Sequence, residues 1–118
     1  INSIFTMHEI DKYGISRVMD EVMHRLDGRP LHVSYDVDAV DPMFAPATGT
    51  VVRGGLTYRE AFYVAERIAE SGMLGSLDMV EVNPLLTSSG EEIDATVQVG
   101  LRLIEALLGG RLYDPVSL

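Results

Sequence analysis

The chain has 118 residues, the size of one ordinary domain, and carries a formal net charge of −9. Its nine lysine and arginine residues are scattered, which excludes a nucleic-acid partner because phosphate recognition needs clustered basic side chains. The lack of cysteine excludes disulfides and thiolate zinc sites and fits a cytoplasmic location, and no apolar run reaches the roughly 20 residues of a membrane span.

Residues 6–26 are predicted to be helical, because their apolar side chains recur every three or four positions. Thr6 and Glu9 have the spacing of a capping box, and Gly14 is a candidate break in the helix. The segment Asp27-Gly28-Arg29-Pro30 then ends the helix, and the β-forming residues after it predict a strand from Leu31 to Val37.

Residues 38–55 contain three pairs of structure-breaking residues and no hydrophobic period, which predicts a long loop. A loop of this length inside a compact domain usually carries function. Thr57 and Glu60 have the spacing of a second capping box, and the apolar stripe that follows predicts a helix ending at Gly72.

A second strand is predicted from Leu74 to Val82, and Asn83-Pro84 closes it because proline cannot continue a central ladder. Ser89 and Glu92 mark the start of a third helix, which ends at Gly109-Gly110. An irregular tail, residues 111–118, follows. The third helix carries an apolar stripe made of Ile93, Val97, Leu101, Ile104 and Leu108.

This alternation of strands and helices predicts an α/β fold with a parallel sheet covered by helices. Only two or three strands are present, so the sheet would have open edges and its helices would be half uncovered. We therefore expect the chain to be part of a larger domain whose other strands lie upstream.

Acidic residues fall at the carboxyl ends of both predicted strands, where parallel α/β folds gather their ligands. Asp36 and Asp38 would share one face of an extended strand, and their oxygens suit Mg²⁺ and Mn²⁺. Burying Glu81 unpaired would be costly, so it needs a cation, a hydrogen-bond donor or a shifted pKa, and a positively charged ligand would serve. A calcium loop of the EF-hand type is excluded, because its sixth and twelfth positions hold Asp41 and Ala47.

The stretch Ser34-Tyr35-Asp36-Val37-Asp38-Ala39-Val40-Asp41-Pro42 resembles the manganese-binding signature of the ureohydrolase family. Three further stretches follow in the order and at the separations of arginases: Ala45-Pro46-Ala47-Thr48-Gly49-Thr50, Gly54-Gly55-Leu56-Thr57-Tyr58-Arg59-Glu60 and Asp78-Met79-Val80-Glu81-Val82-Asn83-Pro84. This resemblance covers nearly the whole chain. It implies that residues 1–118 are the C-terminal part of a single catalytic domain with the three-layer fold of arginases and deacetylases.

The resemblance implies that Asp36 bridges two Mn²⁺ ions, that Asp38 chelates one of them, and that Glu81 receives the substrate guanidinium. Thr50 is implied as a supporting hydroxyl nearby. A hydroxide held between two such ions would attack the guanidinium carbon of L-arginine and release urea and ornithine. The implied protein is a binuclear manganese hydrolase of the arginase type.

The remaining ligands of the family, a histidine and an Asp-x-His-x-Asp motif, belong to upstream segments that this sequence does not contain. We therefore expect the isolated chain to be inactive. His32 lies on the predicted first strand and is interpreted as a hydrogen-bonded core histidine, and His8 and His24 as surface residues of the first helix.

The resemblance also implies a homo-oligomer, a trimer or a hexamer, in which Arg59, Glu60 or Arg111 could form ion pairs between subunits. Ser34 and Asp78 are candidates for orienting the metal ligands or Glu81, and an ordinary buried hydrogen bond would explain them equally well.

Two other functions stay open. Agmatinase and other amidinohydrolases share the metal and glutamate motifs, although Ala47 and the stretch from Gly54 to Glu60 resemble arginases more closely. A non-catalytic fragment or truncated paralogue would retain the fold and an oligomerisation surface without holding two metal ions. An Asp-x-His-x-Asp motif in the same gene or in a partner chain would separate these alternatives.

Overall fold

The computed structural model describes residues 3–110, and helices and strands alternate within this range. The predicted tail, which includes Arg111, lies outside the described residues. In chain order the elements are α1 (Met7–Tyr13), α2 (Ile15–Leu26), β1 (Leu31–Asp36), the short 3-10 helix η1 (Val37–Ala39), α3 (Tyr58–Ser71), β2 (Leu74–Val80), a second 3-10 helix η2 (Pro84–Leu86) and α4 (Gly90–Leu107).

The first predicted helix is in fact two helices that meet at Gly14. At the start of α1 the predicted capping box is present, since the amide nitrogen of Thr6 donates to the Glu9 carboxylate over 2.7 Å. Gly14 has a φ of 80°, a value that side-chain-bearing residues adopt only with strain, and the chain turns there into α2. The predicted break at Gly14 is therefore confirmed.

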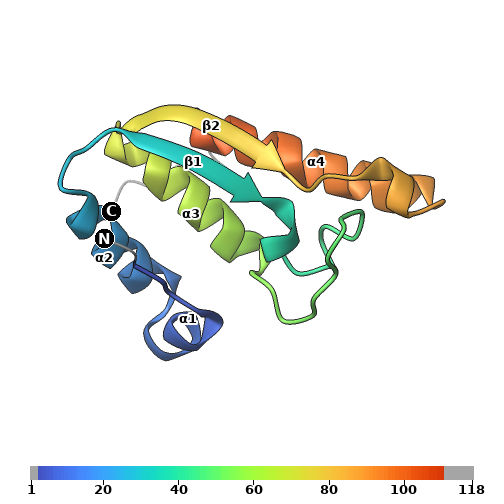
Figure 1. The fold of residues 1–118 in the computed structure, drawn as a ribbon, viewed down its shortest axis with the longest axis horizontal. Coiled ribbons are helices and arrows are strands. Elements are labelled where there is room, and N and C mark those ends of the chain that lie inside the picture. The colour runs from blue at the N-terminus through green and yellow to red at the C-terminus, as the bar shows by residue number, and fades with distance from the viewer. Residues whose placement is uncertain (1–2, 111–118) are drawn as a thin grey trace, which may run out of the picture.

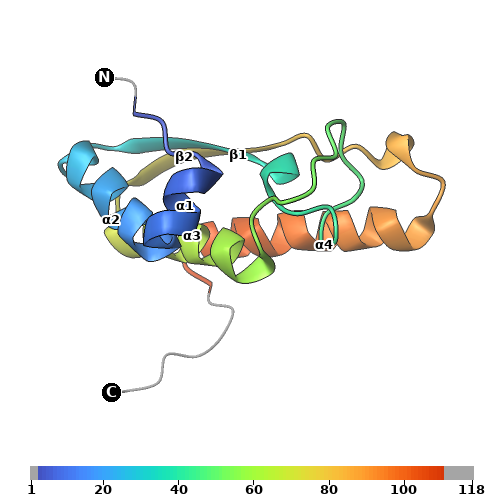
Figure 2. The ribbon, with the colours of Figure 1, turned by 90° about the horizontal axis from the view of Figure 1, so that it is seen from below.

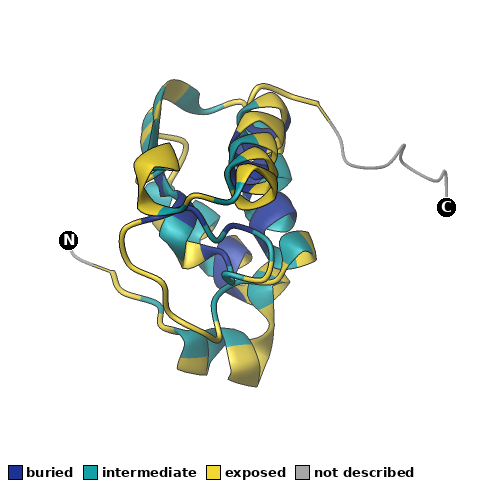
Figure 3. Ribbon diagram, turned by 90° about the vertical axis from the view of Figure 1, so that its right-hand side faces the viewer, coloured by how far each residue is buried: buried dark blue, intermediate teal, exposed yellow. Residues whose placement is uncertain are grey.

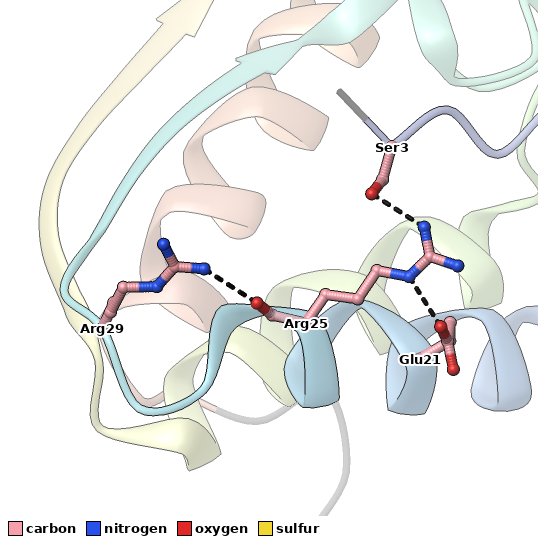
Figure 4. Close-up of polar contacts among 4 residues, drawn as sticks. All are labelled: Ser3, Glu21, Arg25 and Arg29. Carbon is pink, nitrogen blue, oxygen red and sulfur yellow. Dashed lines mark hydrogen bonds and ion pairs between the residues drawn. The ribbon is translucent and has the colours of Figure 1, made fainter. Parts of the chain in front are cut away.

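Two arginines fasten α2 to the segments before and after it (Figure 4). The guanidinium of Arg25 donates to Oε1 of Glu21 over 2.6 Å and to Oγ of Ser3 over 2.8 Å. The guanidinium of Arg29 donates to the carbonyl oxygen of Arg25 over 2.9 Å. This last bond satisfies a carbonyl that the end of a helix leaves without a partner. The contacts fix the path of the chain from α2 into β1.

The sheet consists of β1 and β2, which pair in parallel with Asp36 opposite Val80. The prediction of a parallel α/β fold is confirmed. Within residues 3–110 neither strand has a second neighbour, so each leaves one row of backbone hydrogen-bonding groups unpaired. Because the strands run in the same direction, their carboxyl ends lie side by side (Figure 1).

Helices cover one face of this sheet (Figures 1 and 2). α3 and α4 pack against each other and against β2, and α2 packs on α3. The hydroxyl of Tyr35 on β1 donates to the carbonyl oxygen of Ala61 on α3 over 3.1 Å, which joins the two layers. Figure 3 shows the buried segments gathered between the layers. The core includes Met19, Tyr35, Val37, Val40, Phe62, Ala65, Val99, Leu103 and Leu107.

No described residue packs as a second layer on the opposite face of the sheet, where polar side chains gather. The side chain of His32 is 56% exposed. Its Nδ1 lies 2.7 Å from Oγ of Ser76, and its Nε2 lies 3.4 Å from Oδ2 of Asp78. The interpretation of His32 as a core residue is therefore wrong, although the side chain is hydrogen-bonded as expected. Side chains alternate along a strand, and Tyr35 takes the helix-covered face, so His32 points to the other one.

The buried face of α4 differs from the apolar stripe that the sequence suggested. Leu101 is 50% exposed and Leu108 is 72% exposed. The residues of α4 that are buried are Thr96, Val99, Gly100, Leu103, Ala106 and Leu107. α4 is apolar on more than one side, and packing against α3 and β2 selects the side with the smaller residues. None of the helices within residues 3–110 combines the length and apolar character needed to cross a bilayer.

Candidate functional site

The carboxyl end of β1 carries the first two acidic residues of the candidate site. Asp36 is the last residue of the strand, and its Oδ1 accepts a hydrogen bond from the amide nitrogen of Asp38 over 3.0 Å. This bond makes Asp36 the cap of η1, so Asp38 lies on a tight turn rather than on an extended strand. The expectation that the two side chains share a strand face is therefore wrong, because the turn brings them together instead.

Glu81 follows the carboxyl end of β2, one residue beyond the strand, with a φ of 66°. Residues with a side chain rarely adopt this left-handed conformation, and within residues 3–110 the other example is Asp27. The conformation is held by the next residues, because Val82 forms a β-bridge with Thr48 and the amide nitrogen of Asn83 donates to the carbonyl oxygen of Ala47 over 3.1 Å. Glu81 therefore follows a turn at the edge where β1 also ends, and it is exposed there rather than buried.

Two neighbouring carboxyl groups act electrostatically on Asp38. Burial raises the pKa of Asp38, and the Asp36 carboxyl and the negative charge of Glu81 raise it further. A raised pKa means that the ionised form is disfavoured, so a cation bound among these groups would relieve their repulsion. Hard carboxylate oxygens are also the donors that Mn²⁺ and Mg²⁺ prefer. The chemistry of Asp36 and Asp38 therefore fits part of the coordination shell of such an ion.

The loop between β1 and α3 brings a third segment to the same place (Figure 1). A Cβ atom added at Gly49 would lie 3.4 Å from Oε2 of Glu81, so the backbone of Gly49 adjoins this carboxylate. Thr50 is the next residue, and it is exposed and makes no side-chain hydrogen bond to any of residues 3–110. The sequence pattern singled out Thr50 and missed Gly49.

Asp41 ties this loop together, a role that the sequence analysis missed. Its carboxylate accepts hydrogen bonds of 2.9 Å from the amide nitrogens of Met43 and Gly54. These two bonds lower the pKa of Asp41. The amide nitrogen of Leu56 also donates to the carbonyl oxygen of Ala39 over 2.8 Å. The turn that contains Asp38 is thereby fastened to the segment that precedes α3.

Gly55 lies at the closest point of that contact. A Cβ atom there would come within 2.7 Å of the amide nitrogen of Asp41 and 2.8 Å of the carbonyl oxygen of Ala39. Only glycine fits this approach of two backbones. The Gly54-Gly55 pair was recognisable in the sequence as a break, but its packing partner was not.

A separate hollow of about 500 Å³ lies between α1 and α2 and is lined by Phe5, Tyr13, Arg17 and Val18 among others. It contains none of the acidic residues at the strand ends. Its lining mixes single charges with apolar surface and brings no set of groups to one point, so it is not the candidate site.

A sequence model of the arginase family matches residues 2–109. The chain belongs to the arginase family. It is 51% identical over 108 residues to arginase-2, mitochondrial, of Mus musculus, covering 89% of this chain and 30% of that protein. It is 50% identical over 111 residues to the arginase of Schizosaccharomyces pombe, covering 92% of this chain and 34% of that protein. The chain thus spans about a third of the length of these relatives.

Solved structures of the arginase family share this fold. The native arginase of Bacillus caldovelox superposes with a TM-score of 0.84 at 42% identity, over 94% of this chain and 36% of that one. The agmatine ureohydrolase of Thermoplasma volcanium superposes with a TM-score of 0.71 at 27% identity, over 85% of this chain and 31% of that one. The expected partial arginase fold is therefore confirmed.

The arginase-family motifs carry the residues that the structure brings together, namely Asp36, Asp38, Gly49 and Glu81. Ser34 and Asp78 lie on the uncovered face of the sheet, and Asp78 contacts His32. Within residues 3–110 no three His, Cys, Asp or Glu side chains are arranged to hold a metal ion.

Proposed function

We propose that the gene product containing this chain is a manganese-dependent arginase that cleaves the guanidinium group of L-arginine to ornithine and urea. The observation that carries this proposal is that Asp36 and Asp38 lie on one tight turn at the carboxyl end of β1, while Glu81 follows the carboxyl end of the neighbouring parallel strand β2. Membership of the arginase family supports the choice of reaction. In this proposal the 118 residues supply part of the active site.

Asp36 and Asp38 are proposed to hold the metal. Oδ1 of Asp36 accepts a hydrogen bond from the amide nitrogen of Asp38, which restrains the Asp36 side chain. The remaining lone pairs of the Asp36 carboxylate are available to a cation. Two Mn²⁺ ions bound together supply a nucleophile from water at neutral pH. Two aspartates cannot fill the coordination shells of two ions, so the other ligands are proposed to come from residues outside this chain.

Glu81 is proposed to bind the substrate guanidinium. A carboxylate and a guanidinium form short, charge-assisted and often paired hydrogen bonds, which orient the flat cation as well as bind it. The β-bridge of Val82 to Thr48 places the backbone of Glu81 beside the loop, and Oε2 of Glu81 adjoins the backbone of Gly49. Thr50, on the neighbouring loop, is proposed as a supporting hydroxyl.

The rest of the site and the assembly also belong to this proposal. The chain covers 30% of the mouse relative and 34% of the yeast relative, and both strands of its sheet have an unpaired edge within the described residues. We propose that the upstream part of the same domain pairs with these edges and supplies the missing ligands. A homotrimer or hexamer is proposed on the resemblance described above, and a cytoplasmic location on the lack of cysteine.

The substrate assignment rests on identity and fold together. The arginase structure of Bacillus caldovelox is 42% identical to this chain, whereas the agmatine ureohydrolase of Thermoplasma volcanium is 27% identical. This difference favours arginine over agmatine. A non-catalytic fragment is the second candidate, and the observation in its favour is the incomplete set of metal ligands among residues 3–110.

The test is to express the complete gene product, load it with Mn²⁺ and measure urea release from arginine and from agmatine. We expect urea from arginine, with kcat/KM well above the value for agmatine, and loss of activity after chelation. Equal or faster release from agmatine would change the assigned substrate. A metal-loaded protein that releases urea from neither compound would favour the non-catalytic alternative.

A further inference from the structure

Gly49 has no backbone reason to be glycine. Its φ lies outside the left-handed range, in contrast to Gly54, whose φ of 83° favours glycine. It also differs from Gly55, where backbone atoms at 2.7 to 2.9 Å exclude a Cβ atom. An alanine would fit the local backbone at position 49, so the reason for glycine lies in the space beside it.

That space is bounded by two side chains. A Cβ atom at Gly49 would lie 3.4 Å from Oε2 of Glu81 and 3.9 Å from Cδ1 of Leu86, and no other atom lies within 4 Å apart from its chain neighbours. Both distances are ordinary van der Waals contacts. A methyl group would therefore be tolerated by the fold, but it would cover one side of the Glu81 carboxylate.

A guanidinium ion needs that side to be open. The group is planar and weakly hydrated on its two faces, and it binds carboxylates edge-on through short hydrogen bonds. The groups on that side of Oε2 are the bare peptide of Gly49 and the side chain of Leu86, and neither carries a charge that would repel a flat cation whose edge reaches Glu81. Leu86 is 54% exposed, so its surface is open to a ligand.

We propose that Gly49 is a positioning residue for the substrate, which keeps one side of the Glu81 carboxylate open so that a flat guanidinium group can bind against the loop backbone. This inference rests on the function proposed above and adds a steric requirement of the site. Gly49 acts on substrate binding through the space that it leaves, and it takes no part in holding the metal.

The test is Gly49→Ala in the complete gene product loaded with Mn²⁺, and the chain offers a matched control. Gly100 on α4 also adjoins side chains, since a Cβ atom there would lie 3.6 Å from Cγ2 of Val82 and 3.8 Å from Cγ of Met79. Gly100→Ala therefore adds a methyl group at similar distances from two side chains, next to the residue that follows Glu81, without covering the carboxylate.

For Gly49→Ala we expect KM for arginine to rise about tenfold or more, the effect of weakening a charge-assisted hydrogen bond, while kcat changes by less than about threefold. Arginine binding to the metal-free proteins, measured by calorimetry so that no hydrolysis occurs, should weaken to the same extent. The Mn²⁺ content and the melting temperature should match those of Gly100→Ala, whose KM should equal that of the wild type.

If the wild-type protein releases urea and Gly49→Ala has an unchanged KM, this inference is overturned while the proposed function stands. An equal rise of KM in both variants, or loss of Mn²⁺ from Gly49→Ala, would also overturn it, because the effect would then be structural. A wild-type protein that neither releases urea nor binds arginine would overturn the proposed function and this inference together.

Discussion

The amide nitrogen of Asp38 donates to Oδ1 of Asp36 over 3.0 Å, so two aspartates that follow a strand are folded onto one tight turn. The two negative charges therefore lie closer together than they would on an extended strand. The raised pKa of Asp38, due to burial and to the neighbouring Asp36 and Glu81, reflects this crowding. In the function proposed above, a divalent cation binds this group.

Replacing Asp36 with asparagine should weaken Mn²⁺ binding by more than about 100-fold, since altering even a group that only orients a metal ligand commonly weakens binding by 10- to 100-fold. Urea release should fall with it. Metal content after dialysis and the arginine assay would measure both effects in the complete gene product. Asp94→Asn, on the exposed side of α4, is the control and should leave both values unchanged. Normal Mn²⁺ retention by Asp36→Asn would refute the metal-binding role.

Replacing Glu81 with glutamine keeps the shape of the side chain and removes its charge. We expect kcat/KM for arginine to fall by about 100-fold, because hydrogen bonds to a charged group contribute about 1.5–3 kcal/mol each. The Mn²⁺ content should remain that of the wild type. Glu105→Gln, an exposed glutamate on α4, provides the control. A variant that loses its metal but binds arginine normally would show that Glu81 is a metal ligand instead.

Gly55→Ala should disturb the turn that carries Asp38, because the added methyl group meets backbone atoms of Asp41 and Ala39 at less than 3 Å. Forcing extra volume into such a contact lowers the free energy of unfolding by about 1–3 kcal/mol. Urea denaturation would measure the loss. The comparison is Gly90→Ala at the start of α4, where a Cβ atom meets nothing within 4 Å. Equal stability of the two variants would contradict the close approach.

The stability contributed by Asp41 should depend on pH. Its pKa in the folded protein is depressed by hydrogen bonds from the amide nitrogens of Met43 and Gly54. A carboxyl of this kind stabilises the fold above its unfolded pKa, and that stability is lost as the pH falls through the lower, folded pKa. The melting temperature of Asp41→Asn should therefore lie below that of the wild type at neutral pH. In acid the two melting temperatures should lie closer together.

Melting curves from neutral pH down to about pH 3, below the ordinary aspartate pKa of about 3.9, would measure this effect. The exposed Asp11 on α1 provides the control as Asp11→Asn. If the melting temperatures of Asp41→Asn and the wild type differ by the same amount at every pH, the hydrogen-bonded carboxylate of Asp41 does not stabilise the fold as expected.

The 118-residue chain produced by itself should release no urea even in excess Mn²⁺, because Asp36 and Asp38 cannot supply the ligands for two dications. It should also associate, since its strand edges are unpaired and large apolar side chains such as Leu85, 93% exposed, face solvent. Arginine assays and light scattering would test both points. A stable monomer that hydrolyses arginine would show that the chain holds a complete site.

Local sequence signals determined where the helices and strands of this protein lie. The capping boxes at Thr6 and Thr57 and the break at Gly14 were readable because each acts within a few residues of the chain. The acidic residues after both strands were also readable, because parallel strands end at one edge of a sheet. The order of these motifs sufficed to indicate the arginase family.

Tertiary structure alone decided how these parts meet. α4 has apolar residues on more than one side, and only its packing against α3 and β2 selects Leu103 and Leu107 for the core while Leu101 stays exposed. The left-handed turn at Glu81 and the closeness of Gly49 to its carboxylate depend on a β-bridge between segments more than thirty residues apart in the chain. Such contacts follow from the packing of the whole fold, because no local preference of the chain encodes which distant segment will lie beside it.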